Sequence, residues 1–181
     1  MNETDKIIIP LSKSKITLLL TGSIIFVILG ILFILHPERF LTIFFKNEEV
    51  IRITGFASVG FFGLCAIFYV VKLFDNKPGL ITDKNGILDN SSGISSGLIA
   101  WQDIQDINVL EIVKQKIILI IVSNPEDYIV RQKRGFKRKI SRLNYIKYET
   151  PVQITANGLK IGFNELLAIL ESNLTKYKDR K

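Results

Sequence analysis

The sequence is poor in the residues that most catalytic and metal sites require. Its 181 residues include one cysteine and one histidine. Cys65 lies within one apolar stretch and His36 at the end of another, so they cannot form a Cys-His catalytic pair or a zinc site. A single cysteine also excludes an intrachain disulfide, and glycine-rich phosphate-binding motifs are missing. We therefore expect no catalysis, no cofactor and no bound metal ion.

Long apolar runs, by contrast, are concentrated in the first 75 residues. The first extends from Ile16 to His36 without a charged side chain, and the second from Ile53 to Phe74. At 1.5 Å rise per residue, the first measures roughly 30 Å, the thickness of a bilayer's hydrocarbon core. We predict a transmembrane hairpin over residues 16–75, with helices at 16–36 and 53–74. A cleaved signal peptide is the alternative for the first run, but its apolar part would be shorter and a small-residue cleavage motif would follow.

Basic residues beside the two runs predict the orientation. Six lie on the side of the chain ends and three in the connecting loop, which favours cytoplasmic N- and C-termini. The six are Lys6, Lys13, Lys15, Lys72, Lys77 and Lys84, and the three are Arg39, Lys46 and Arg52.

Small residues predict how the two helices pack. Such residues let helix backbones approach closely within a membrane. We expect a hairpin packed through one face of each helix, with a homo-oligomer through the same surfaces as the alternative. The faces are Gly22, Phe26 and Gly30 in the first run, and Ala57, Gly60, Gly63 and Ala66 in the second.

Residues 1–15 are expected to be a flexible or interfacial lead-in. The chain after Pro78, by contrast, has the pattern of a small soluble domain, which we predict over residues 79–178. Asn85-Gly86 predicts a tight turn between strands at 80–82 and 87–89. The apolar spacing of residues 164–176 predicts an amphipathic helix laid on the sheet. Further strands are expected at 98–101, 107–113, 116–122, 151–155 and 159–161, that at 116–122 being central and buried on both faces.

The strongest local charge signal lies between Arg131 and Arg142, where seven residues are basic and none is acidic. Each Lys or Arg near an anionic membrane contributes about 1 kcal/mol of attraction. We predict lipid contact here, with the aromatic ring of Phe136 inserting. The alternative is a solvated β-hairpin loop, and nucleic acid is a less favoured partner because the run is short. The predicted lipid-contact residues are Arg131, Lys133, Arg134, Phe136, Lys137, Arg138, Lys139 and Arg142.

The single tryptophan, Trp101, is the candidate for a protein contact, since exposed tryptophans often anchor interfaces. Its alternative is a core aromatic side chain at the start of a strand.

Several segments resemble an uncharacterised bacterial family with two N-terminal transmembrane helices and a cytoplasmic pleckstrin-homology-like (PH-like) domain. The resemblance implies an α+β chain, in which the hairpin precedes a small, mostly antiparallel PH-like barrel or sheet with a C-terminal helix, and it implies the bacterial inner membrane. It implies no catalytic residue. The segments are LSKSKI (11–16), FFGLCAIFYVVKLFDNKPGLITDKNGILDNSSGISSGLIAWQDI (61–104), IILIIVSNPEDYI (117–129), LNY (143–145) and TPVQITANGLKI (150–161).

From these observations we expect a membrane-anchored, non-catalytic binding or regulatory module in contact with membrane lipids. The alternative is a protein-protein scaffold or assembly subunit of a membrane complex, with an unidentified protein partner.

Overall fold

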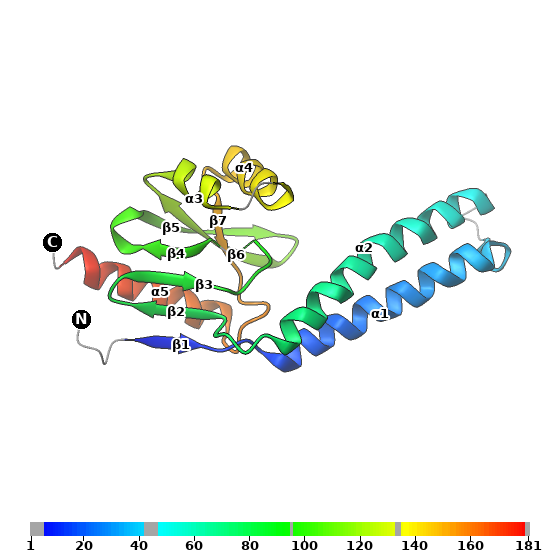
Figure 1. Ribbon diagram of the computed structural model, residues 1–181, viewed down its shortest axis with the longest axis horizontal. Coiled ribbons are helices and arrows are strands. Elements are labelled where there is room, and N and C mark those ends of the chain that lie inside the picture. The colour runs from blue at the N-terminus through cyan, green and yellow to red at the C-terminus, as the bar shows by residue number, and fades with distance from the viewer. Residues whose placement is uncertain (1–5, 42–46, 95, 133–134, 180–181) are drawn as a thin grey trace. The chain divides into compact units, whose positions relative to one another are not determined.

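The computed structural model describes residues 6–41, 47–94, 96–132 and 135–179. The chain divides into a helical unit, Lys13–Asn76, and a sheet unit that combines Met1–Ser12 with Lys77–Lys181. A helical hairpin, two antiparallel sheets and a C-terminal helix confirm the predicted α+β class (Figure 1).

The helical unit consists of α1 (Lys13–Leu35) and α2 (Glu48–Phe74), and a short 3-10 helix, η2 (Pro37–Phe40), follows α1. Both long helices are long and apolar enough to cross a membrane. Asn47 caps α2, because its side-chain oxygen accepts a hydrogen bond from the Glu49 backbone N–H at 2.8 Å. Each helix begins a few residues before the apolar run from which it was predicted.

The two helices approach each other closely at Gly30 and Gly55. A Cβ atom added to Gly55 would lie 2.7 Å from the Gly30 carbonyl oxygen, so a larger residue would force the backbones apart. Next to this contact, Phe26 and Phe62 stack at 4.4 Å between ring centroids. The predicted face of α1 is therefore used at Phe26 and Gly30, and Ala57 of the predicted α2 ridge lines the groove between the helices, but the ridge is wrong at Gly60 and Gly63. Space is open beside Gly60 and Gly63, as it is beside Gly22.

The open end of the hairpin is closed by Lys13, the first residue of α1. Its Nζ donates to the carbonyl oxygens of Leu73 at 2.6 Å and Asp75 at 2.7 Å. The last carbonyls of a helix lack intrahelical partners and carry partial negative charge, so an ammonium group is well matched to them. Lys72 and Asp75 add an ion pair at 3.4 Å.

The first sheet of the sheet unit contains β1 (Ile7–Ile9), β2 (Leu80–Asp83), β3 (Gly86–Asp89) and β4 (Gly97–Ala100), in that spatial order. β1 pairs antiparallel with β2, Ile9 opposite Leu80. Ile7–Ile9 is therefore a strand of the sheet, and the prediction of a flexible or interfacial lead-in is wrong for these residues, whereas residues 1–5 lie outside the described part of the chain. Pro10 follows this strand directly, and a strand tolerates proline at its end.

The predicted hairpin at 80–89 is present, but its glycine has another role than the one expected. Gly86 has φ 153°, whereas Asn85 does not have a positive φ. A Cβ atom on Gly86 would lie 2.0 Å from the Ile99 carbonyl oxygen of β4. Gly86 is thus required by the close approach of β4, and the turn itself is held by Asp83, whose side chain accepts from the Asn85 N–H at 2.8 Å.

The second sheet contains β5 (Ile104–Ile112), β6 (Gln115–Val122) and β7 (Val152–Ile154). The central strand β6 is buried at Ile118, Leu119 and Ile120, as its apolar run predicted. Helices α3 (Pro125–Arg131) and α4 (Phe136–Tyr148) connect β6 to β7, and α5 (Phe163–Lys178) ends the unit. The strand expected at 159–161 is reduced to one bridge, between Leu11 and Leu159.

The core of the sheet unit lies between the sheets and α5. Leu166 and Leu170 of α5 are buried. Asn173 of the same helix donates to the Thr82 hydroxyl of β2 at 3.2 Å, and both side chains are buried. The apolar face predicted for the C-terminal helix is therefore the face that packs, with one polar contact fixing its position along β2.

Removing residues 1–12 should destabilise the sheet unit, because Ile9 and Leu11 are both buried in it. Burial of a large aliphatic side chain contributes about 1.5–3 kcal/mol to stability. The loss of two such side chains should therefore lower the free energy of unfolding by about 3–6 kcal/mol, an upper estimate. The comparison is between residues 77–181 alone and residues 1–12 joined to 77–181 by a short Gly-Ser linker, measured by chemical denaturation. Equal denaturation midpoints would contradict a structural role of β1.

Gly55→Val should weaken the packing of α1 on α2, because the new side chain would meet the backbone of Gly30. Gly60→Val is the matched control, since nothing lies within 4 Å of the Cβ position there. We expect a clearly lower thermal-unfolding midpoint for Gly55→Val in mild detergent, followed by circular dichroism, and little change for Gly60→Val. Equal decreases in the unfolding midpoint of the two variants would contradict a close contact between α1 and α2 at Gly55.

Candidate functional site

The predicted lipid-contact residues lie on two helices and the segment between them. Arg131 ends α3, and Phe136, Lys137, Arg138, Lys139 and Arg142 belong to α4. Lys133 and Arg134 are outside the described residues. The β-hairpin geometry of the alternative is wrong, because the described residues of the run belong to helices, and the burial along α4 has a helical period. Ser141 is buried, and Arg138, Tyr145 and Tyr148 are half-buried on the same side.

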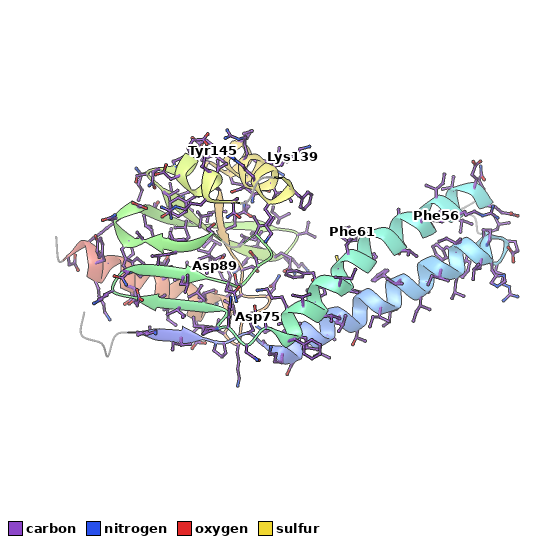
Figure 2. All side chains as sticks on the ribbon, in the orientation of Figure 1. Phe56, Phe61, Asp75, Asp89, Lys139 and Tyr145 are labelled. Atoms are coloured by element: carbon purple, nitrogen blue, oxygen red, sulfur yellow. The ribbon has the colours of Figure 1, made fainter. Side chains whose placement is uncertain are left out.

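The outer face of α4 carries large apolar side chains. Phe136 is 75% exposed, Leu143 53% and Ile146 73%. Positions 136, 143 and 146 fall on one side of a helix at 100° per residue, and Lys139 and Lys147 lie among them. Lys139 extends from the outer side of the helix (Figure 2). Phe136 was predicted from the sequence, whereas Leu143 and Ile146 were not, although their helical spacing from Phe136 is visible there.

Two of the predicted arginines serve the fold. Arg131 donates to the Leu98 carbonyl oxygen at 3.2 Å and lies 4.4 Å above the Tyr128 ring. Arg142 forms a two-pronged ion pair with Glu126 of α3, at 2.9 and 3.0 Å. These contacts join α3 to β4 and to α4, so both arginines are less available to an outside anion.

The remaining cations gather at the start of α4. Lys137, Arg138 and Lys139 follow the N-cap Gly135, and the first turn carries no acidic residue. Within the described part of the chain, Lys137 and Lys139 form no ion pair. Positive side chains at the positive end of a helix dipole are unfavourable, by roughly 0.3–1 kcal/mol each. An anion near this turn would relieve that repulsion.

Trp101 lies in the core, as its alternative interpretation expected. It is 2% exposed, and its indole N–H donates to the Asp83 carbonyl oxygen at 2.7 Å. A protein contact through Trp101 would require it to leave this position.

A polar network adjoins α3 at Tyr128. The Tyr128 hydroxyl donates to Asp103 Oδ2 at 2.8 Å and accepts from the Ala100 N–H at 3.3 Å. Burial, reinforced by the hydrogen bond to Asp103, raises the pKa of Tyr128 to about 12. The network links β4 to the segment before β5 and to α3, and it holds the base of the helix pair that displays the outer face of α4.

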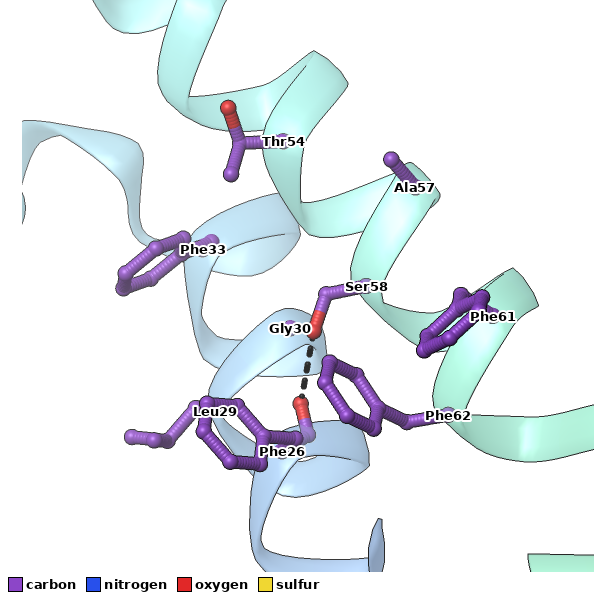
Figure 3. A pocket seen from close by; sticks show the side chains of 9 residues that line it. All are labelled: Phe26, Leu29, Gly30, Phe33, Thr54, Ala57, Ser58, Phe61 and Phe62. Atoms are coloured by element: carbon purple, nitrogen blue, oxygen red, sulfur yellow. Dashed lines mark hydrogen bonds between the residues drawn. The ribbon is translucent and has the colours of Figure 1, made fainter. Parts of the chain in front are cut away.

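The helical unit has a groove of about 420 Å³ between α1 and α2 (Figure 3). Four of its nine lining residues are phenylalanines, namely Phe26, Phe33, Phe61 and Phe62. Ser58 donates to the Phe26 carbonyl oxygen at 3.0 Å, and Thr54 to that of Val50 at 2.8 Å. Both hydroxyl groups of the lining are thus used by the helices themselves, which leaves apolar surface suited to lipid acyl chains.

No protein-family model, curated protein or solved structure matches this chain.

Tyr128→Phe should lower the free energy of unfolding at pH 7 by about 1–3 kcal/mol, because the Ala100 N–H and Asp103 each lose a partner. Between pH 10 and pH 12 the unfolded chain releases the Tyr128 proton, whereas the folded chain retains it. The native protein therefore loses stability across this window, and its advantage over the variant shrinks. Chemical denaturation at several pH values measures both, and a pH-independent difference would contradict the raised pKa.

Proposed function

We propose that this chain is a membrane-anchored, non-catalytic binding module whose sheet unit contacts anionic lipid headgroups through the outer face of α4. In this proposal α1 and α2 span the bacterial inner membrane, and both chain ends are cytoplasmic. Pairing of β1 with β2 supports an even number of crossings, since both strands must lie on the same side of the membrane. The count of basic residues favours the cytoplasmic side.

The observation that carries the proposal is the combination of apolar and basic side chains on one exposed helix face. Phe136, Leu143 and Ile146 are largely exposed, and Lys139 and Lys147 are exposed beside them. A helix with this composition binds in the interfacial plane of a membrane, where its apolar side chains enter the acyl boundary and its cations meet anionic headgroups. A purely solvated helix gains nothing from three large exposed apolar residues.

The electrostatics of the first turn of α4 supports an anionic partner. Its cations oppose the helix dipole, and an anionic surface would remove this opposition while attracting each charge. The helical unit holds the sheet unit at a membrane permanently, so even a weak attraction acts at high effective concentration. The sheet unit consists of a four-stranded antiparallel sheet, a three-stranded antiparallel sheet and the C-terminal helix α5. This order of elements also accords with the PH-like domain that the resemblance implies.

A protein scaffold is the second candidate, and strand β5 favours it. Within the described part of the chain, the nine-residue strand β5 pairs on one side only, with β6, through eight of its residues. Most of its residues are exposed on both faces, and Asp106 and Glu111 are its only charged residues. An edge strand of this length can accept a strand from a partner protein.

Neutralising the lysines of α4 tests the lipid function. In the sheet unit with residues 13–76 replaced by a short linker, shown first to unfold cooperatively, Lys137, Lys139 and Lys147 are changed to Gln. At about 1 kcal/mol for each lysine that reaches the surface, binding to phosphatidylglycerol-containing vesicles should fall by up to roughly 100-fold. Cosedimentation measures the partition.

The matched control changes Lys84, Lys160 and Lys176 to Gln, which removes the same charge from exposed positions outside α4. Equal losses in the two triple variants would indicate non-specific attraction, and an absence of vesicle binding would sink the proposal. Recovery of one stoichiometric protein by crosslinking in the native membrane, lost when β5 is altered, would favour the scaffold.

A further inference from the structure

The turn between β5 and β6 combines an unfavourable backbone conformation with an exposed apolar side chain. Val113 and Lys114 have φ values of 47° and 63°. Two central residues with positive φ form the type I′ turn, which normally uses Asn and Gly, and a β-branched residue with positive φ is a steric outlier. Val113 is 90% exposed, so contacts within the protein do not compensate for its conformation. The neighbouring Ile112 is exposed as well.

Contacts within the sheet unit place this turn beside the point where the chain enters α1. Gln115, the first residue after the turn, accepts at its side-chain oxygen a hydrogen bond from the Asn157 amide at 3.2 Å. The next residue, Gly158, accepts at its carbonyl oxygen from the Ser12 N–H at 2.8 Å. Ser12 immediately precedes α1. Two hydrogen bonds, Gln115 to Asn157 and Gly158 to Ser12, therefore connect the turn with the residue that leads into an apolar, membrane-length helix.

The charges around the turn suit a lipid interface. Lys114 stands in the turn itself, and Lys116 stands opposite Glu111 in the strand register. The Lys116 ammonium lies 5.7 Å from the centre of the Phe163 ring. Lysine can extend its charged end to headgroups while apolar neighbours enter the acyl boundary.

The geometry points to the β5–β6 turn as a membrane-inserting wedge, in which Ile112 and Val113 enter the lipid interface and Lys114 contacts the headgroups. The occupant of this surface is the bilayer that the helical unit spans. Insertion gives Val113 the apolar surroundings that the folded sheet unit does not supply. The wedge is separate from the outer face of α4, and either can exist without the other.

Fluorescence depth measurements on the full chain test this inference. In a Cys65→Ala background, Val113→Cys carries an environment-sensitive NBD dye, and the protein is reconstituted into lipid nanodiscs. Lys84→Cys is the matched control, because it lies in the turn between β2 and β3, at the opposite end of that sheet from Ser12 by the strand register. We expect a blue-shifted emission at 113, quenching by lipids spin-labelled near the top of the acyl chain, and protection from aqueous iodide.

The control dye at 84 should show the reverse: emission typical of water, quenching by iodide and none by labelled lipid. If the dye at 113 behaves like the dye at 84, the wedge is overturned.

A second variant separates the apolar side chain from the position of the turn. With the dye at Lys114→Cys, Val113→Asn should abolish quenching by spin-labelled lipid, although asparagine is better suited than valine to a positive φ. Unchanged quenching would mean that insertion does not depend on Val113, which would overturn the wedge. A dye at Leu143→Cys reports on α4 independently, so failure of the lipid-contact proposal for α4 and failure of the wedge give different results.

Discussion

The pairing of β1 with β2 is the constraint on which the rest of this architecture depends. β1 comes before the helical hairpin in the chain and β2 after it, yet the two strands are neighbours in one sheet. The hairpin is therefore an insertion between adjacent strands. An insertion of this kind must return to where it left, which two antiparallel helices with a closed base achieve. Lys13, bound to the last carbonyls of α2, supplies that closure.

Two exposed apolar sites of the sheet unit, the outer face of α4 and the β5–β6 turn, depart in different ways from the usual preferences of local structure. α4 begins with cations at the positive end of its dipole, and the β5–β6 turn places a valine where glycine or asparagine would be favoured. Each departure costs stability: among the described residues no ion pair offsets the charges of Lys137 and Lys139, and Val113 is 90% exposed. Departures of this kind concentrate at functional surfaces. Both carry apolar groups with lysine beside them, a composition that a bilayer interface accommodates.

Features set by continuous local patterns could be predicted from the sequence. The two apolar helices, the buried run of β6 and the amphipathic α5 each have a period that one kind of element explains. Features that depend on distant partners could not. Ile7–Ile9 is too short to predict as a strand until β2 is known to lie beside it. Gly55 does not stand out from the other small residues of α2 until Gly30 faces it.

The candidate site was predicted only in part, for the same physical reason. Phe136, Leu143 and Ile146 share one helix face. The charge pattern between Arg131 and Arg142, on which the prediction was based, does not reveal this spacing. Arg131 and Arg142 resemble the other cations in sequence, and only their contacts with Leu98 and Glu126 separate them. The turn at Val113 had no sequence signal, because valine is rarely found in such a conformation. Conversely, Asn85-Gly86 carried the strongest turn signal but adopts a different geometry, imposed by Ile99.

The position of the helical hairpin between β1 and β2 also sets the order of folding steps during synthesis. β1 leaves the ribosome before the hairpin, and its partner β2 follows only after the whole hairpin has been made. Closing so long a loop as free chain would be slow and entropically costly. Once α1 and α2 have packed, Lys13 and Asp75 are in contact, and the distance that β1 must search for β2 shrinks to a few residues. A defect in the packing of α1 on α2 would therefore keep β1 from pairing with β2. The observed consequence would be misfolding of the sheet unit, although the sequence of that unit is unchanged.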